Sequence, residues 1–212
     1  NSPDTLSYLW VQLDQNIYKP NSDARTSATV SRDAWAKPRN PEEGLKFDAL
    51  RANFESLTFD GGFNITNVKS GSRKLAHMIN RTMMRIDLPQ PLKPGQRFSF
   101  EVEWNYKINE QKVLGGRSGF EKFDDKNDLF EIAQWFPRMA AYYDTYGWQH
   151  KQFLGAGEFT LEFGDYDVEI TVPADHIVAS TGVLQNPGSV LTSVQRDRLA
   201  KAKNSNKPVI IV

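Results

Sequence analysis

The segment FSFEVEWNY, residues 98–106, alternates strictly between large apolar and polar side chains. Its even positions carry four aromatic residues and one valine, and its odd positions carry serine, glutamate and asparagine. A period of two is typical of an antiparallel strand that has one face in a core and the other in water. Residues 91–96, PLKPGQ, precede this strand, and Pro94-Gly95 favours the centre of a tight turn there.

A second pair of alternating segments lies at residues 158–163, EFTLEF, and 166–172, YDVEITV. Gly164-Asp165 stands between them and can turn the chain or form a bulge, which predicts paired strands. Weaker strand patterns occur at residues 8–14, 63–68, 82–88, 129–136, 177–181 and 209–212. Ten or so short strands predict an all-β fold, an antiparallel β sandwich that is saddle-like in shape.

Helical patterns are short and few. Residues 193–203 are rich in helix formers, with Ser193 placed to cap the helix and Asn204-Ser205-Asn206 placed to end it. A second short helix is expected at residues 48–56, after a long loop at residues 33–47. The sequence therefore predicts a single β domain over residues 1–212, with one or two short helices.

The alternation also predicts which side chains form the core. Four acidic neighbours on the same strands, Glu101, Glu103, Glu162 and Glu169, are expected to face water. The expected core positions are Phe98, Phe100, Val102, Trp104, Phe159, Leu161, Phe163, Val168, Ile170 and Val172.

Composition excludes several classes of function. The chain has 212 residues, and its 26 Lys plus Arg balance 26 Asp plus Glu, which leaves no basic footprint for nucleic acid. The chain contains no run of about 18 apolar residues, so the sequence predicts no membrane span. Cysteine is absent, so disulfides and thiolate zinc sites are excluded. The three histidines, His77, His150 and His176, are too widely spaced for a helical zinc pair and are expected at the surface or on strand edges.

Catalytic motifs are missing as well. Residues 115–119, GGRSG, lack the lysine and the strand-turn-helix context of a phosphate loop, so we interpret them as a flexible hairpin tip. The carboxylate pairs Asp124-Asp125 and Glu158/Glu162 are typical of solvated surfaces. By itself, the chain shows no catalytic machinery.

Four phrases together resemble a known family. They are NSPDTLSYLWVQLDQNIY from residue 1, PLKPGQRFSFEVEWNYKI from residue 91, EIAQWFPRMAAYYDTYGWQHKQFLGAGEFTLEFGDYDVEITVPADHIVASTGVLQNP from residue 131, and KPVIIV from residue 207. They resemble the amino-terminal domain of bacterial zinc aminopeptidases of the aminopeptidase N and leukotriene hydrolase family. The order and spacing of W-F-P-R, G-E-F, V-P-A-D and T-G-x-L make this likeness specific, and it is weakest at residues 25–43.

The resemblance implies a multi-domain peptidase in which a saddle-like β domain precedes a catalytic domain. That second domain would hold zinc through H-E-x-x-H and a distant Glu, and the metal would activate water. Neither H-E-x-x-H nor a G-x-M-E-N-like strand occurs here. Both ends of the chain look cut, so we expect a piece of the enzyme that holds no zinc and is not active alone. Its expected partners are its own catalytic domain and a peptide substrate, and the family suggests the cell envelope (periplasm) or secretion.

The resemblance also points to two candidate site residues, Glu131 and Gln134. In related enzymes the β domain lends a Gln or Glu to the substrate's amino group, because a protonated amine needs carboxylate and carbonyl oxygens. The usual Gln-x-Gln or Gln-x-Glu pattern is absent. Three positions apart on a strand, these two side chains would point to opposite faces. We therefore expect at most one of them to contact the amine.

The alternative for this stretch is purely structural. Glu131 would then be solvated and Gln134 would bond to backbone groups. Arg138 and Asp144 are expected to pin the loop after Pro137, and the strand at residues 129–136 is expected to end there because proline cannot donate to a strand ladder.

Two other classes of protein remain open. One is a carbohydrate- or protein-binding β-sandwich module, which a row of exposed aromatic residues would favour. The other is an inactive scaffold relative of the peptidases, which this sequence does not separate from an active enzyme.

Overall fold

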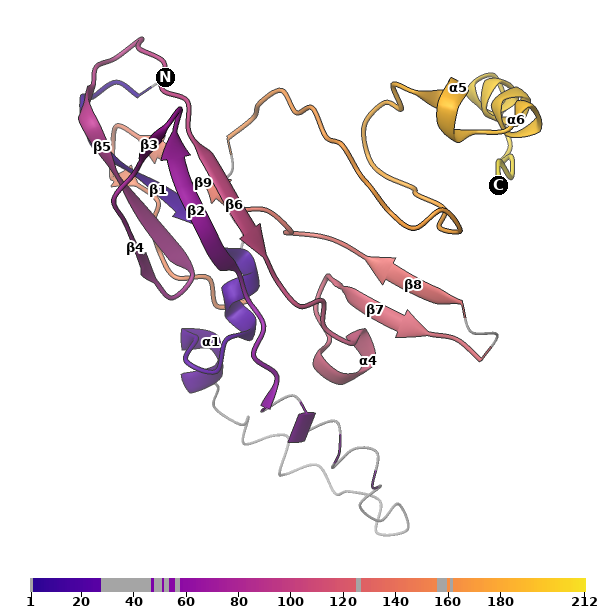
Figure 1. The fold of residues 1–212 in the computed structure, drawn as a ribbon, viewed down its shortest axis with the longest axis horizontal. Coiled ribbons are helices and arrows are strands. Elements are labelled where there is room, and N and C mark those ends of the chain that lie inside the picture. The colour runs from indigo at the N-terminus through magenta and orange to yellow at the C-terminus, as the bar shows by residue number, and fades with distance from the viewer. Residues whose placement is uncertain are drawn as a thin grey trace. The chain divides into compact units, whose positions relative to one another are not determined.

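The computed structural model describes residues 2–27, 47, 51, 54–55, 58–124, 127–155, 160 and 162–212. The chain divides into two compact units, Asn1–Phe163 and Gly164–Val212, whose elements are labelled in Figure 1. Small antiparallel sheets and a few short helices make up the first unit, which confirms a β-rich fold, whereas the elements of the second unit are two helices, α5 (Pro187–Val190) and α6 (Ser193–Lys203). The single β domain over residues 1–212, as part of a larger peptidase, stays a prediction.

The first unit contains a four-stranded antiparallel sheet in the order β4-β5-β1-β9. The central pair runs from Leu6 opposite Leu92 to Gln12 opposite Met83, with an irregularity between Leu6 and Tyr8. Figure 1 shows the long β5 strand between β4 and β1. The strand bounds are β1 Leu6–Gln12, β4 His77–Asn80, β5 Met83–Leu92 and β9 Arg138–Met139.

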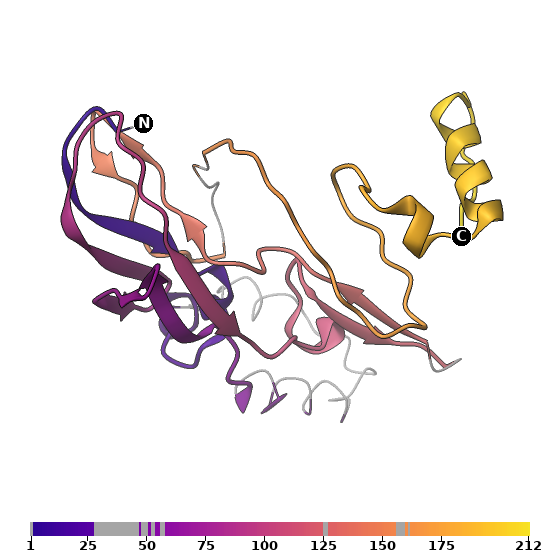
Figure 2. The ribbon, with the colours of Figure 1, turned by 45° about the horizontal axis from the view of Figure 1, so that its top comes forward.

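A three-stranded antiparallel sheet has the order β3-β2-β6. Its strands are β2 Asn64–Ser70, β3 Arg73–Lys74 and β6 Glu101–Asn105. Ser70 opposes Arg73 across a two-residue turn, where Gly71 takes a φ of 58°. Glycine suits this position because left-handed φ costs it nothing sterically. Figure 2 shows β2 and β6 as neighbours, as their pairing requires.

Both sheets contribute to one hydrophobic core. The alternation of residues 98–106 is confirmed as a burial pattern, since its apolar side chains pack on this core while Glu101 and Glu103 are exposed. Only Glu101–Asn105 forms a strand, in which Val102 pairs with Val68. The buried core residues are Leu6, Leu9, Val11, Leu13, Phe63, Val68, Leu75, Met83, Met84, Ile86, Ala140 and Trp148.

The strand predicted at residues 166–172 is wrong, whereas its predicted partner at residues 158–163 lies largely outside the described residues. Phe163 is 105% exposed, Val168, Ile170 and Val172 are also exposed, and no strand forms in the described residues from 162 onward. Phe159 and Leu161 lie outside the described residues. Alternation produces a strand only where a neighbouring strand accepts its hydrogen bonds and covers its apolar face. Within its own unit, residues 166–172 find no such neighbour. The weak strands expected at residues 177–181 and 209–212 are likewise absent.

The helix at residues 193–203 is confirmed as α6, Ser193–Lys203, which Figure 2 shows at the carboxyl-terminal end. Its cap is Thr192 and not Ser193: the Thr192 hydroxyl accepts from the Gln195 amide, and the Gln195 side chain accepts from the Thr192 amide. This reciprocal pair satisfies two amides that a helix start leaves without partners. The short helix α5, Pro187–Val190, precedes it.

The remaining elements of the first unit are short. The helix expected at residues 48–56 and the loop expected at residues 33–47 lie mostly outside the described residues. The short helices are η1 Asp14–Tyr18, α1 Asp23–Thr26 and α4 Gln111–Leu114. The short strand pairs are β7 Gly119–Lys122 with β8 Asp128–Glu131, and β10 Tyr142–Tyr143 with β11 Gly147–Trp148.

Phe63 offers a direct test of the core. It is 1% exposed and packs edge-on against Trp104 and Tyr106. We expect Phe63→Ala to lower the free energy of unfolding by about 3–5 kcal/mol, because it removes a buried aromatic ring and leaves a cavity. The same substitution at Phe163 should change it by less than about 0.5 kcal/mol, because that ring is in water. Urea unfolding measures both, and an equal loss in both variants would contradict the assigned core.

Candidate functional site

Three consecutive polar side chains are buried where β1 ends and η1 begins. Asp14, Gln15 and Asn16 are 1%, 3% and 0% exposed. Burying polar groups is costly unless each one finds a hydrogen-bond partner. We call these residues the polar turn. These residues are not among the predicted site residues, although three polar residues directly after an apolar strand pattern were the available signal.

Asn16 connects the polar turn to both sheets. Its Nδ2 donates to the carbonyl of Arg81, at 2.6 Å, in the turn between β4 and β5. Its Oδ1 accepts from the backbone amide of Phe63, at 2.8 Å, next to the start of β2. A single buried amide therefore fixes two segments that lie far apart in the sequence, one on each sheet.

Gln15 holds the stretch that contains Gln134. Its Nε2 donates to the carbonyls of Ala133, at 3.0 Å, and Gln134, at 3.1 Å. Ser118 holds the same stretch: its Oγ donates to the Ala133 carbonyl, at 2.6 Å, and accepts from the Ala133 amide, at 2.8 Å. The backbone at residues 133–134 is thus anchored by two side chains from other parts of the chain.

Asp14 anchors the residue that follows Pro137. The Nε of Arg138 donates to Asp14 Oδ2, at 2.7 Å, and Arg138 Nη2 also contacts this oxygen. Gln12 Nε2 donates to Asp14 Oδ1, at 2.6 Å. Burial raises the pKa of Asp14, and the charge of Arg138 and the hydrogen bonds from Gln12 and Arg138 offset part of that rise. The carboxyl is therefore a buried group whose charge depends on Arg138.

The strand expected at residues 129–136 is wrong in its extent. It ends at Glu131, well before Pro137, and β9 begins directly after the proline at Arg138. Gln134 has a φ of 53°, a left-handed conformation that an extended strand excludes. The hydrogen bonds from Gln15 and Ser118 take the place of a strand ladder there.

The two candidate site residues have different environments. Glu131 is exposed at the end of β8, opposite Gly119, and makes no ion pair with any residue that the structure describes. Gln134 is half-buried and lines a pocket that Glu131 does not reach. Asp144 is exposed and accepts a hydrogen bond only from Thr145 among the described residues, so of the two predicted anchors Arg138 is the one that bonds to another segment.

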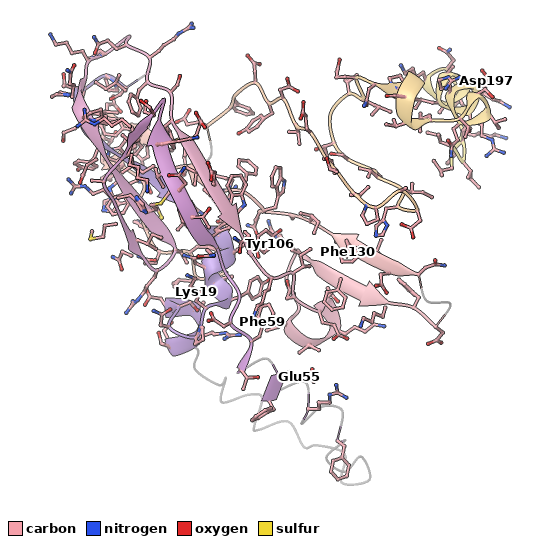
Figure 3. The ribbon with its side chains drawn as sticks, viewed as in Figure 1. Lys19, Glu55, Phe59, Tyr106, Phe130 and Asp197 are labelled. Atoms are coloured by element: carbon pink, nitrogen blue, oxygen red, sulfur yellow. The ribbon has the colours of Figure 1, made fainter. Side chains whose placement is uncertain are left out.

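The glycine-rich segment is not a hairpin tip, contrary to the prediction. It follows α4 and leads into β7. Gly116 lies so close to Tyr18 that a Cβ at this position would be 2.2 Å from the tyrosine oxygen. Tyr18 in turn packs edge-on against Phe59, which Figure 3 labels. Glycine at position 116 is therefore required by packing against η1.

The pocket lies between η1 and the glycine-rich segment. Its volume is about 90 Å³, room for roughly three water molecules. Burial raises the pKa of Tyr18 above its ordinary value, and its hydroxyl is protonated at neutral pH as that of an unperturbed tyrosine is. The polar residues that line it are Asp14, Gln15, Tyr18, Arg117, Ser118 and Gln134.

The histidines contribute nothing to this pocket. All three are exposed, and the ring of His150 stacks on Trp10. In the part of the chain that the structure describes, no three His, Asp or Glu side chains are grouped as metal ligands would be. None of the described helices is both long and apolar enough to cross a membrane.

Comparison with known proteins finds no matching family model, no matching curated protein and no matching solved structure. The aminopeptidase resemblance therefore stays a prediction.

Removing the charge of Arg138 should destabilise the fold through the buried carboxyl of Asp14. We expect Arg138→Ala to lower the free energy of unfolding by about 3–5 kcal/mol at neutral pH, because Asp14 is left as an uncompensated buried charge. The pKa of Asp14 is already raised and should rise further without Arg138. A carboxyl whose pKa is raised in the folded state contributes to the free energy of unfolding at pH values below its unfolded-state pKa. That contribution is lost as the pH rises through the folded-state pKa.

The cost of Arg138→Ala should therefore shrink as the pH falls through the raised pKa of Asp14. Chemical unfolding of both proteins across the acid range measures this, with the exposed Arg117→Ala as the control. A cost that stays constant with pH would contradict the assigned pairing.

Proposed function

We propose that this chain is the non-catalytic amino-terminal domain of a zinc-dependent aminopeptidase, and that Gln134 contacts the free amino group of its peptide substrates. One observation carries the proposal. Gln134 lies beside a pocket and is held in a left-handed conformation by two anchors. Gln15 donates a hydrogen bond to the carbonyl of Gln134, and Ser118 holds the preceding residue, Ala133.

Backbone strain of this kind is informative. A non-glycine residue in the left-handed region costs on the order of 1–3 kcal/mol and persists only where surrounding contacts impose it. Such residues cluster at binding and catalytic sites, where the strain fixes a side chain in position. Gln15 and Ser118 are the contacts that impose it here.

The chemistry of Gln134 suits the proposed ligand. Its amide offers a carbonyl oxygen as an acceptor, and an ammonium group needs several such oxygens. W-F-P-R follows Gln134 directly in the sequence, which is one of the phrases that resemble the peptidase family. Zinc, the catalytic water and the remaining amine ligands would belong to the catalytic domain of the parent enzyme.

The β7–β8 strand pair supports the association with another domain. Every residue of β8 is exposed, and Leu129, Phe130 and Ile132 are large apolar side chains among the exposed positions. Figure 3 labels Phe130 on this strand. An isolated two-stranded ribbon is marginally stable in water, so it gains from being covered. The catalytic domain of the same protein is the proposed cover, and a periplasmic or secreted location accompanies the family.

The full-length protein tests the proposed activity. It should release chromophore from aminoacyl p-nitroanilides, lose this activity to a chelator and regain it with zinc, while the 212-residue chain alone should be inactive. Turnover by the chain alone that survives repurification would contradict the non-catalytic role. A full-length protein that cleaves no such substrate with zinc present would contradict the peptidase assignment.

Gln134 can be tested within that enzyme. Gln134→Ala keeps a Cβ and therefore keeps the same backbone strain, so the change removes only the amide. We expect kcat/KM for substrates with a free amino terminus to fall by about ten- to a hundredfold, the effect of losing one charge-assisted hydrogen bond. Amino-terminally blocked substrates should lose much less.

Glu131→Ala is the matched control for this substitution, because Glu131 is exposed and lies outside the pocket. It should leave kcat/KM within about twofold of the unaltered enzyme, the effect of a neutral surface change. If Glu131→Ala reduces kcat/KM and Gln134→Ala does not, the amine contact is assigned to the wrong residue.

A further inference from the structure

Three polar groups of residues that line the pocket have no partner among the described residues, and one of them is the side-chain amide of Gln134, assigned above to the substrate amine. The other two are the Oε1 atom of Gln15 and the guanidinium of Arg117. The rest of the polar turn is fully engaged, as are both polar functions of Ser118. These two groups therefore indicate what the pocket would accept.

The orientation of the Gln15 amide is fixed. Its Nε2 donates to two carbonyls, which assigns the nitrogen and the oxygen of this side chain without ambiguity. The oxygen is consequently an acceptor in a constant position on a residue that is only 3% exposed. An acceptor without a protein partner on a residue that lines a pocket can bind a ligand that brings a hydrogen-bond donor.

Arg117 supplies the opposite function. It lies between Gly116, which packs on Tyr18, and Ser118, whose Oγ shares the Ala133 carbonyl with Gln15. Ser118, the neighbour of Arg117, and the Gln15 amide therefore meet at one carbonyl oxygen. Its guanidinium is exposed and presents donors in a fork that matches a carboxylate.

The charges of the lining agree with this assignment. The carboxylate of Asp14 is paired with Arg138, so the two charges largely cancel. Arg117 is then the lining residue whose charge has no ion-pair partner among the described residues. An anionic group is favoured at Arg117, and a donor is favoured at Gln15.

The geometry points to a binding site for a small free α-amino acid, with its carboxylate on Arg117 and its ammonium group on Gln15 Oε1. A volume of about 90 Å³ suits glycine or alanine, and a longer side chain would have to extend out of the pocket. The site goes beyond the proposed function. A released amino acid is a product of an aminopeptidase, but the binding concerns this chain alone and is tested without any turnover.

Binding is tested by titrating the chain with glycine and following the backbone amide signals of Gly116, Ser118 and Ala133 by NMR. These signals should shift in a saturable way, with a dissociation constant in the millimolar range that suits a ligand of so few atoms. N-acetylglycine lacks the ammonium group and glycinamide lacks the carboxylate. Each should bind at least about tenfold more weakly, because one charge-assisted contact is lost.

Substitutions at Arg117 distinguish a specific contact with the ligand carboxylate from a general effect of positive charge on glycine binding. Arg117→Ala should weaken glycine binding at least about tenfold, and Arg117→Lys less, because lysine keeps the charge but loses the forked geometry. Arg97→Ala is the matched control, since Arg97 is also exposed and should leave binding unchanged. Because position 117 is exposed, these variants should fold normally.

Three results would overturn the proposal. They are glycine shifts that do not saturate by about 100 mM, N-acetylglycine or glycinamide binding as tightly as glycine, and unchanged binding in Arg117→Ala. Any of them would leave the peptidase proposal intact, because that proposal is measured by turnover of the full-length protein.

Discussion

The hydrogen bonds of the polar turn, Asp14 to Asn16, determine how the first unit is assembled around its core. Each side chain connects to a different segment: Asp14 to Arg138, Gln15 to Ala133 and Gln134, and Asn16 to the β4–β5 turn and the start of β2. Buried polar groups must be paired, so these connections specify one arrangement and penalise others. The hydrophobic core favours the burial of apolar side chains, whereas the hydrogen bonds of the polar turn determine which segments lie together.

The same turn explains why Gln134 departs from regular structure. A strand through residues 129–136 would satisfy the backbone by a ladder, but Gln15 and Ser118 satisfy it from the side. The left-handed φ of Gln134 is then a consequence of long-range contacts, since Gln15 is far away in the sequence. This placement beside a pocket underlies the proposed substrate contact of Gln134, and the same hydrogen bonds orient the Gln15 amide on which the proposed amino acid site depends.

Sequence periodicity predicted burial well where a neighbouring strand exists and failed where none does. Residues 98–106 alternate and have β2 alongside, whereas residues 166–172 alternate equally well and are exposed. Helix α6 was predictable because its capping and helix-forming residues act within a few positions, although the cap itself is Thr192. Of the candidate site, Gln134 was identified through resemblance alone. Gln15, Ser118 and Arg117 could not be, because their roles depend on contacts between distant segments.

Hydrogen exchange at the Ala133 amide tests the central role of the polar turn most directly. This amide lies outside any strand, and its described partner is the side chain of Ser118. If side chains anchor this segment, the amide should exchange about as slowly as the paired amides of β1 and β5, and Gln15→Leu should accelerate it without affecting those strands. Exchange at the rate of an unbonded surface amide in the unaltered protein would contradict the anchoring, and with it the fixed position of Gln134.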